Sequence, residues 1–286
     1  MMVPGDQPVL GTDLVTEGLG AFDELNFLGR GTFGETYHAI RGDDVYAIKV
    51  IYYPDMPEHL WEREIAALER VDHPNIVGFR RSGRLSARGS TYPYLECDFV
   101  NGGTVRHRIA ADEQPSDPAE LRTFVTGLLA GVGEIHDLGI LHRDIKPENI
   151  ALQEGDWGSP VLLDFGLARV LDMSSHTDYP ALIGTAPYMA PEQLRLQPAR
   201  RRSDLFAIGV VTYEAGTGQH PFRTPEISSL QSLHDRIQNV LPEDPGSSPA
   251  FDEALTTVVL RLVSFREYER LGIGEALRDL AGLDES

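Results

Sequence analysis

The sequence predicts an α+β chain of two lobes, with a small β-rich N-terminal lobe and a larger helical C-terminal lobe. Strand-like runs are concentrated before residue 100, and helical spacing of apolar residues dominates after it. A hydrophobic content of 41% in 286 residues is enough to build a core. We expect a flexible tail over residues 1–20, the first lobe over 21–100 and the second over 101–286, with one domain spanning 21–283.

Each lobe is predicted from local patterns. In the first lobe, expected strands are 22–28, 35–40, 45–51, 76–80 and 94–99, with a polar connection between the last two and a helix over 58–71. In the second lobe, expected helices are 119–138, 204–216, 251–264 and 274–283, with short strands at 150–152 and 161–163.

Charge and composition exclude several classes of partner. The net charge of -19 argues against nucleic acid and anionic membranes. The sequence has no run of 18 apolar residues and no basic-then-apolar start, so we expect neither a membrane span nor a signal peptide. Cys97 is the single cysteine, which excludes an internal disulfide. We expect a cytoplasmic protein.

One polar loop concentrates catalytic chemistry. Asp144, Lys146 and Asn149 lie within six residues, between apolar flanks that can tether the loop. Asp144 could accept a hydroxyl proton, Lys146 could neutralise a phosphoryl oxygen, and Asn149 could hold a metal ion. The alternative is a polar turn that ends a helix, with Pro147 as the breaker.

The two lysines are a second signal. Of 25 basic residues, 23 are Arg, and the other two are Lys49 and Lys146. A compact ammonium binds phosphate as a point charge, whereas the guanidinium fork needs more room. Lys49 stands in an apolar strand, so a buried ammonium there needs a carboxylate. Glu64 fits the apolar stripe of the following helix better than its competitor Glu62.

Two further patterns favour nucleotide phosphates. Gly29, Gly31 and Gly34 join two expected strands, which argues against a Rossmann site and suits backbone amides closing over phosphates. Asp164 ends an apolar strand, where a carboxylate is costly unless it binds a donor or a cation. With Asn149 it would give two oxygen ligands for Mg²⁺. Helix capping is the alternative role for Asp164.

Over about residues 22–283 the chain resembles eukaryotic-type serine/threonine protein kinases, including bacterial members. The matching motifs stand in family order: the glycine-rich loop, Tyr46-Ala47-Ile48-Lys49, Arg63-Glu64-Ile65, His73-Pro74-Asn75-Ile76-Val77, His142-Arg143-Asp144 with Lys146 and Asn149, Asp164-Phe165-Gly166, Gly184-Thr185, Met189-Ala190-Pro191-Glu192 and the run from Asp204.

The resemblance implies a role for each matching position. Lys49 would hold the α- and β-phosphates and pair with Glu64, Asp144 would act on the acceptor hydroxyl, and Lys146 would steady the γ-phosphoryl group. Asn149 and Asp164 would bind Mg²⁺, with Mn²⁺ as the alternative. Asp204 would brace the catalytic loop, and Glu192 would pair with Arg270. The ATP site would be formed by Leu28, Gly29, Gly31, Gly34, Thr36, Ala47, Lys49, Cys97, Asp98, Val100 and Ala151.

Some positions depart from the family pattern or suggest regulation. Thr36 and Ala151 replace the usual Val and Leu, and with Cys97 they suggest a roomier adenine pocket. Arg143 would pair with a phosphorylated loop residue, Thr177 first and Ser175 second, and Thr185 would bond to the catalytic loop. For residues 174–179 the alternative is that their hydroxyls only keep a surface loop hydrated. For Arg200-Arg201-Arg202 the expectation is a solvated face, and the alternative is docking of an acidic partner.

These observations predict an ATP-dependent serine/threonine protein kinase that phosphorylates protein substrates and its own activation loop. The alternatives are a pseudokinase that serves as a nucleotide-binding scaffold and a kinase of small molecules. The filled polar positions argue against the first. The segment from Gly184 to Glu192, which in the family shapes a peptide platform, argues against the second.

Overall fold

The computed structural model describes residues 9–31, 34–52, 58–164, 186–222, 227 and 229–282, apart from the side chains of Leu60, Arg63, Glu64 and Ala67. The chain divides into two compact units. Within the described residues, the first unit contains 9–72 and 77–99, and the second contains 73–76, 100–164 and 186–282. The strands of the predicted first lobe and the helices of the predicted second lobe fall into different units.

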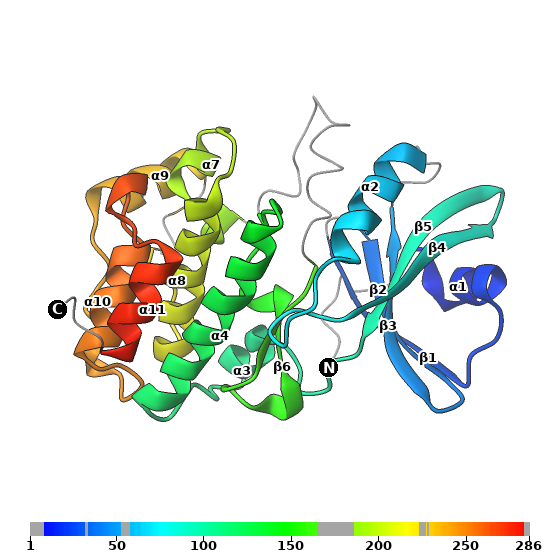
Figure 1. Cartoon of the computed structure of the whole chain (residues 1–286), viewed down its shortest axis with the longest axis horizontal. Helices are drawn as coiled ribbons and strands as arrows, with labels where there is room; N and C mark the ends of the chain where they lie inside the picture. Colours follow the sequence, from blue (N-terminus) through cyan, green and yellow to red (C-terminus); the bar gives the residue numbers. More distant parts are fainter. Residues whose placement is uncertain are drawn as a thin grey trace. The chain divides into compact units, whose positions relative to one another are not determined.

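An antiparallel sheet forms the centre of the first unit, and its strand order is β1-β2-β3-β5-β4 (Figure 1). The strands are β1 (Glu24–Arg30), β2 (Gly34–Arg41), β3 (Asp44–Ile51), β4 (Phe79–Ala87) and β5 (Ser90–Asp98). Helix α2 (Glu58–Leu68) buries Trp61, Ile65 and Leu68, the apolar stripe that predicted it. Successive side chains in a strand point to opposite faces, so the register decides which residues share a face.

The N-terminal helix α1 (Gly11–Leu19) corrects the prediction of a loose tail over residues 1–20. It packs beside β4 and β1, with Leu14 and Val15 buried against the sheet (Figure 1). The same apolar cluster contains Tyr37 and Ile48 of the sheet. Burial of a few apolar side chains orders a segment whose Gly and Thr content favours a loop by composition.

The β4–β5 hairpin is longer than predicted. We expected a polar connection after residue 80, but β4 continues to Ala87, and Ser90 already pairs with it. Arg88 and Gly89 form the turn with φ values of 51° and 81°, the left-handed pair that suits the twist of a two-residue hairpin. The Ser and Gly residues that suggested a loop therefore lie within the strand pair.

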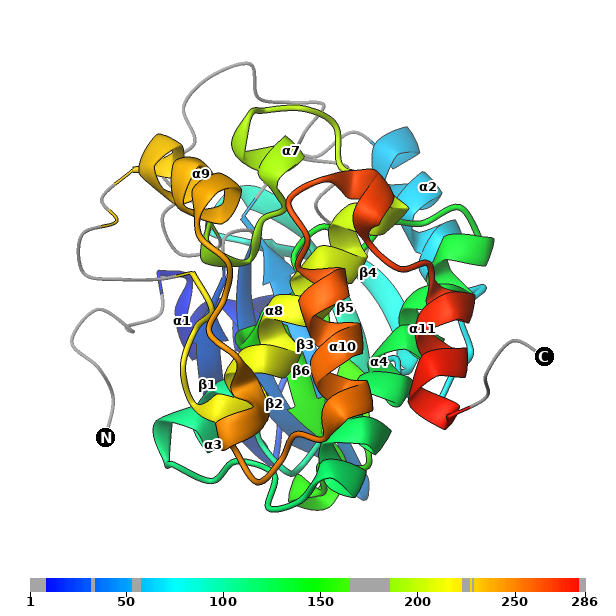
Figure 2. The same cartoon turned by 90° about the vertical axis from the view of Figure 1, so that its left-hand side faces the viewer.

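Helix α8 (Arg201–Thr217) is the centre of the second unit, because it is buried almost all round from Ser203 to Gly216. Helices α4 (Pro118–Asp137) and α10 (Glu253–Leu262) pack along it, and α11 (Ile273–Ala281) lies against α4 and α10 (Figure 2). Asp117 caps α4 by accepting bonds from two backbone amides of its first turn. Gly218 ends α8 with a φ of 72°.

Short elements join these helices and form the edge that carries the polar loop. Strands β6 (Ile150–Leu152) and β7 (Pro160–Leu162) pair antiparallel, as the sequence predicted within one residue. The remaining elements of the described second unit are α3 (Val105–Ala110), η1 (Pro147–Asn149), η2 (Gln153–Gly155), η3 (Ala186–Tyr188), α7 (Pro191–Leu194), α9 (Leu230–Asn239), η4 (Pro245–Ser247) and η5 (Glu267–Glu269).

Candidate active site

A buried carboxylate on α8 anchors the polar loop that contains Asp144, Lys146 and Asn149. Asp204 accepts backbone hydrogen bonds from His142 at 3.0 Å and Arg143 at 2.9 Å. Its Oδ2 also lies 2.8 Å from Nε2 of His136, and both side chains are almost completely buried. A buried carboxylate needs such partners to offset the loss of water. The predicted bracing of the loop by Asp204 is confirmed.

His142 ties the loop to the end of β7, a link that the sequence analysis did not assign. Its ring is fully buried, with Nε2 2.9 Å from the carbonyl oxygen of Leu163 and Nδ1 3.4 Å from the backbone nitrogen of Asp144. Arg143 and Asp164 both have positive φ, 66° and 60°. A left-handed backbone conformation is energetically unfavourable for residues other than glycine, and such residues are often found at functional sites.

Asp144, Lys146 and Asn149 converge as the sequence suggested. Nζ of Lys146 lies 3.0 and 2.9 Å from the two carboxylate oxygens of Asp144. Nδ2 of Asn149 donates to the main-chain oxygen and to Oδ2 of Asp144, both at 2.8 Å. Only 16% of the Asp144 side chain and 14% of the Lys146 side chain are exposed. The carboxylate is therefore held in one orientation by two donors.

Asn149 and Asp164 present oxygen atoms from adjoining backbone. The backbone nitrogen of Leu163 donates to the main-chain oxygen of Asn149 at 2.9 Å, which places the residue before Asp164 against the loop. The amide nitrogen of Asn149 is turned towards Asp144. Oδ1 is therefore the atom of this side chain that could bind a cation. An amide oxygen and a carboxylate are ligands that Mg²⁺ and Mn²⁺ accept. The donor set fits a hard divalent cation.

In the first unit, four of the predicted ATP-site residues share one face of the sheet. Thr36 pairs with Lys49 across β2 and β3, and Ala47 pairs with Cys97 across β3 and β5. Residues two apart along a strand point the same way, so these four side chains lie on one face. The intervening Ile48 belongs to the core under α1 on the other face. The site face is thus the one that α1 leaves uncovered.

Gly34 has a steric reason to be glycine. A Cβ at this position would lie 2.1 Å from the carbonyl oxygen of Val50 on the neighbouring strand. Leu28 sits where the β1–β2 register shifts, as a bulge residue between Phe27 and Gly29, and it is half exposed. Gly31 donates its backbone hydrogen to the carbonyl of Gly34 at 2.9 Å, which closes the described part of the turn.

The remaining predicted site residues fall elsewhere or outside the described residues. Asp98 lies on the opposite sheet face, and its carboxylate is 2.6 Å from Nε of Arg80. Val100 and Ala151 belong to the second unit. Outside the described residues are the Glu64 side chain, and with it the expected pairing to Lys49, and the residues Ser175, Thr177 and Thr185. Lys49 is 8% exposed, whereas the competing Glu62 is exposed.

A small hollow lies beside Asp144. It is lined by Arg143, Asp144, Ile145, Tyr188, Met189, Gln193, Ser203, Asp204 and Ala207. Tyr188 and Met189 come from the segment expected to form a peptide platform, and Gln193 follows it directly. The hollow therefore brings that segment and the polar loop to one place on the second unit.

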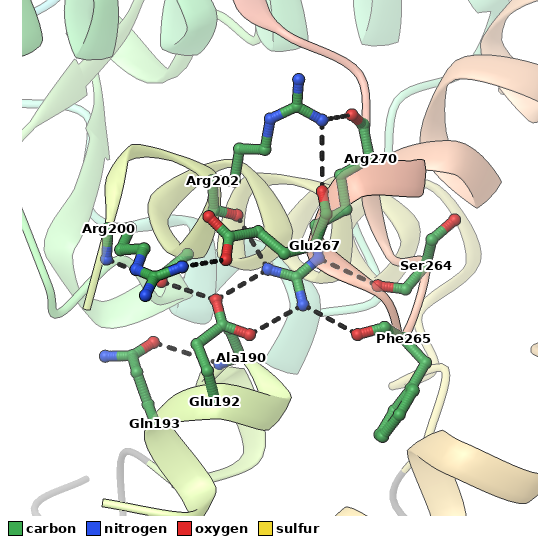
Figure 3. A network of polar contacts seen from close by, with 10 residues as sticks. Ala190, Glu192, Gln193, Arg200, Arg202, Ser264, Phe265, Glu267 and Arg270 are labelled. Carbon is green, nitrogen blue, oxygen red and sulfur yellow. Dashed lines mark hydrogen bonds and ion pairs between the residues drawn. The ribbon is translucent and has the colours of Figure 1, made fainter. Parts of the chain in front are cut away.

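The segment from Ala190 to Gln193 is anchored by an ion pair with Arg270 (Figure 3). Two nitrogens of the Arg270 guanidinium donate to the two carboxylate oxygens of Glu192 at 2.8 and 2.9 Å. Burial alone would raise the pKa of Glu192, but its bonds to Arg270 and Ser203 outweigh burial and lower that pKa. The predicted Glu192–Arg270 pair is confirmed.

The arginine run before Asp204 is not simply a solvated face. Arg200 pairs with Glu267 at 2.8 Å, and Nη1 of Arg202 donates to the carbonyl of Glu267 at 3.1 Å (Figure 3). Arg201 donates to the carbonyl of His136 at the end of α4. The run therefore ties the start of α8 to the segment before α11 and to α4, although Arg200 and Arg201 remain exposed.

A β-rich unit, a helical unit and a polar loop braced by a buried aspartate are the features of a protein kinase. A family model described as a protein kinase domain matches residues 22–280. The chain therefore belongs to the protein kinase domain family, whose members use ATP and a divalent metal ion. The predicted α+β, two-lobe class of fold is confirmed.

Curated relatives are serine/threonine protein kinases by name. The chain is 30% identical over 270 residues to the DNA damage-responsive serine/threonine-protein kinase RqkA of Deinococcus radiodurans, covering 92% of this chain and 39% of that protein. It is 31% identical over 241 residues to the probable serine/threonine-protein kinase PknB of Lactococcus lactis, covering 82% and 37%. It is 31% identical over 222 residues to the serine/threonine-protein kinase PknL of Mycobacterium tuberculosis, covering 76% and 53%.

The match covers only part of each relative, because the chain spans 39%, 37% and 53% of the lengths of these three proteins. The shared part is the kinase domain. Within the described part of the chain, no helix is both long enough and apolar enough to cross a membrane.

Proposed function

We propose that this chain is a serine/threonine protein kinase that transfers the γ-phosphate of ATP to Ser and Thr hydroxyls of protein substrates, including its own activation loop. The observation that carries the proposal is the convergence of Asp144, Lys146 and Asn149 on a loop held by Asp204. A pseudokinase gains no support, since each polar position of this loop is filled. The metal ion of the reaction is Mg²⁺, with Mn²⁺ as the alternative.

The loop supplies positioning and charge. Asp144 orients the acceptor hydroxyl and takes its proton while the hydroxyl oxygen bonds to the γ-phosphorus and the bond to the β–γ bridging oxygen breaks, releasing ADP. Lys146, within 3.0 Å of both Asp144 oxygens, orients that carboxylate and provides a cation for the transferring phosphoryl group. Asn149 restrains the same carboxylate from the other side. No covalent enzyme intermediate is needed.

Asn149 and Asp164 would hold the divalent cation through Oδ1 and a carboxylate oxygen. Bound there, the cation would neutralise negative charge on the phosphates. Asp164 lies two residues after the end of β7 and has a positive φ of 60°. Two protein ligands are few for a hard cation, so the site suits a metal that arrives with nucleotide.

The nucleotide would use the face of the first unit's sheet that lies away from α1. Lys49, 8% exposed, would bind the α- and β-phosphates with Glu64 as its partner, and backbone around Gly29, Gly31 and Gly34 would cover them. The residues proposed for adenine are Leu28, Thr36, Ala47, Cys97 and the backbone of Asp98 in the first unit, and Val100 and Ala151 in the second. Small side chains at 97 and 151 support a roomy pocket.

Regulation would come from the loop hydroxyls. A phosphate on Thr177, or on Ser175, would form charge-assisted bonds to Arg143. The backbone nitrogen of Arg143 donates to Asp204, which fixes the backbone from which the Arg143 guanidinium would reach the phosphate. Thr185 would bond to the catalytic loop.

The decisive experiment is γ-phosphate transfer from Mg-ATP to generic Ser and Thr peptides and to the protein itself. Wild type should transfer phosphate, and Asp144→Asn should lose at least about 10²-fold in rate. Asp137→Asn is the matched control, because Asp137 is 83% exposed at the end of α4. ATP binding without any transfer by wild type would contradict the proposal and favour a scaffold.

A further inference from the structure

Beside the catalytic loop, one arginine is shared between two glutamates. Arg106 of α3 lies with Nε 2.8 Å from Glu148 of η1 and with Nη1 3.0 Å from Glu214 of α8. Nη2 of Arg106 also donates to the hydroxyl of Tyr188, which in turn donates to Glu214 at 2.6 Å. Four separate elements of the second unit thus meet at one guanidinium.

The cluster lies where an acceptor peptide must pass. Glu148 follows Asp144 by four residues, and Tyr188 lines the hollow that contains Asp144. A peptide whose hydroxyl reaches Asp144 therefore has its flanking residues near this cluster. Exposure is graded within the cluster: 8% of the Glu214 side chain is exposed, against 31% for Arg106 and 46% for Glu148.

Arg106 balances one of the two negative charges in the cluster. Two carboxylates face one guanidinium, and Tyr188 stays neutral, because burial, followed by the charge of Glu214, raises its pKa. Burial alone would lower the pKa of Arg106, but the carboxylates of Glu214 and Glu148 reverse the direction and raise it. Arg106 is therefore a permanent cation that fills the position a guanidinium from outside would take between the two glutamates.

We propose that Arg106 is a specificity-determining residue, an internal cation that occupies the Glu148–Glu214 pair and so makes the kinase indifferent to Arg or Lys near the acceptor hydroxyl. Without it, two carboxylates would remain beside the acceptor site of a chain whose net charge is already -19. A guanidinium of the peptide would then bind there with charge-assisted hydrogen bonds. The inference rests on the proposed kinase function and names the class of substrate that the site does not select.

The test compares peptides that differ only in charge. In a neutral acceptor peptide, one Arg is placed at each position from four before to four after the Ser, and citrulline replaces it in the matched peptide. For wild type, we expect the Arg-to-citrulline ratio of kcat/KM to stay within about twofold at every position. For Arg106→Met, the ratio should rise about tenfold at one or two adjacent positions, equivalent to about 1.4 kcal/mol, and should fall again at high salt.

Two further variants assign the effect. Arg108→Met is the matched control: Arg108 lies on the same helix with 30% of its side chain exposed but pairs with Glu113, so its ratios should follow wild type. Adding Glu214→Gln to Arg106→Met should remove most of the gain. If Arg106→Met does not fold, Arg106→Gln decides the question by the same ratio.

Three results would overturn the inference. One is a wild-type enzyme that already prefers Arg tenfold at any position. Another is a folded Arg106 variant whose ratios match wild type everywhere. The third is an equal gain in the Arg108 control. These outcomes are separate from failure of the proposed function, which would appear as wild type transferring no phosphate to any peptide and would remove the specificity role with it.

Discussion

The guanidinium of Arg270 and the carboxylate of Glu192 form a bidentate pair in which every donor of the arginine is used. Besides the two bonds to Glu192, Arg270 donates to the carbonyl oxygens of Ser264, Arg202 and Phe265 at 2.9, 3.1 and 3.1 Å (Figure 3). The side chain has no exposed surface, and its guanidinium carbon lies 5.0 Å from the ring centre of Phe206. Five donors therefore meet five acceptors in a buried site.

Arg270→Met should lower the free energy of unfolding by about 3–5 kcal/mol, because the Glu192 carboxylate loses its paired cation and three carbonyls lose their donor. Urea denaturation at neutral pH measures the change. Arg270→Lys should fall between wild type and Met, since an ammonium has three donors for the five acceptors. Arg200→Met is the control: that side chain is 68% exposed, and its loss should cost less than about 1 kcal/mol. Equal losses in the two Met variants would contradict the structure.

Glu35 in the first unit is a buried carboxylate whose hydrogen bonds are satisfied, as those of the buried Arg270 guanidinium are in the second unit. Its fully buried carboxylate accepts hydrogen bonds from Leu10, Tyr37 and Tyr52 at 3.1, 2.6 and 2.9 Å, and from the backbone of Val9. Burial alone would raise the pKa of Glu35, but the donors, led by Tyr37, lower it below the ordinary 4.5. A lowered folded-state pKa adds stability above pH 4.5 that is lost as pH falls through the folded value.

We therefore expect Glu35→Gln to be less stable than wild type by about 1–3 kcal/mol at pH 7, because an amide NH₂ would face donors. The difference should shrink as the pH falls below 4.5. Parallel urea titrations of the two proteins at pH 7, 5 and 4 give the difference directly, and other carboxylates such as Glu192 cancel in it. A difference that is constant or grows towards acid would show that Glu35 is not ionised in the folded protein.

Much of the fold could be predicted because its signals are local. The apolar spacing of α4 and the flanks of Lys49 in β3 depend on residues within one element. Helix α1 was missed because it carries only Leu14 and Val15 as fully buried residues, and their partners lie in strands later in the chain. The β4–β5 turn was missed because Arg88 adopts the left-handed conformation usually left to Gly or Asn.

The candidate site also contains parts that could be predicted from local sequence and parts that could not. Asp144, Lys146 and Asn149 are close in sequence, so their convergence could be expected from spacing. The cluster joins Arg106 to residues that lie 42 to 108 positions away in the sequence, and no local pattern predicts such a meeting. His142 stood within a recognised motif, yet its bond to Leu163 depends on the position of β7. Tertiary contacts of this kind require the structure.

Cys97→Phe should weaken binding of bulky N6-substituted adenine analogues by at least about tenfold while changing ATP affinity by less than about threefold. The register pairs Cys97 with Ala47, on the sheet face that carries Lys49, so a larger side chain would intrude on that face. Competition binding with a fluorescent nucleotide measures both constants. Cys97→Ser, nearly the same size, should leave both unchanged. Equal losses for ATP and the analogues would indicate that Cys97 is an ordinary core residue.

Loop phosphorylation should be visible by peptide mass spectrometry after incubation with Mg-ATP. We expect phosphate on Thr177 first and Ser175 second, and none in the Asp144→Asn protein, which cannot transfer it. Activity should fall at least several-fold in the double variant Thr177→Ala and Ser175→Ala. An active enzyme without phosphate on residues 174–179, or a double variant with unchanged activity, would mean that these hydroxyls only solvate the loop.

Lys49→Arg should nearly abolish phosphoryl transfer while the protein stays folded. Lys49 stands between Thr36 and Leu95 across three strands with 8% of its surface exposed, so the wider guanidinium has little room. The chain uses 23 Arg and two Lys, so a position that tolerated Arg would be expected to carry it. Loss of a positioned phosphate contact costs a few kcal/mol in the transition state, or about 10²-fold or more in kcat/KM.

Steady-state transfer to a Ser peptide at varied ATP measures this loss, and a thermal unfolding curve checks the fold. Thr36→Val is the matched control, since it changes the neighbouring side chain on the same sheet face without altering charge. Its rate should stay within about threefold of wild type, because the phosphate contact is kept. Near-normal turnover by Lys49→Arg would remove Lys49 from the phosphate site, because a guanidinium cannot reproduce the compact ammonium in so closed a position.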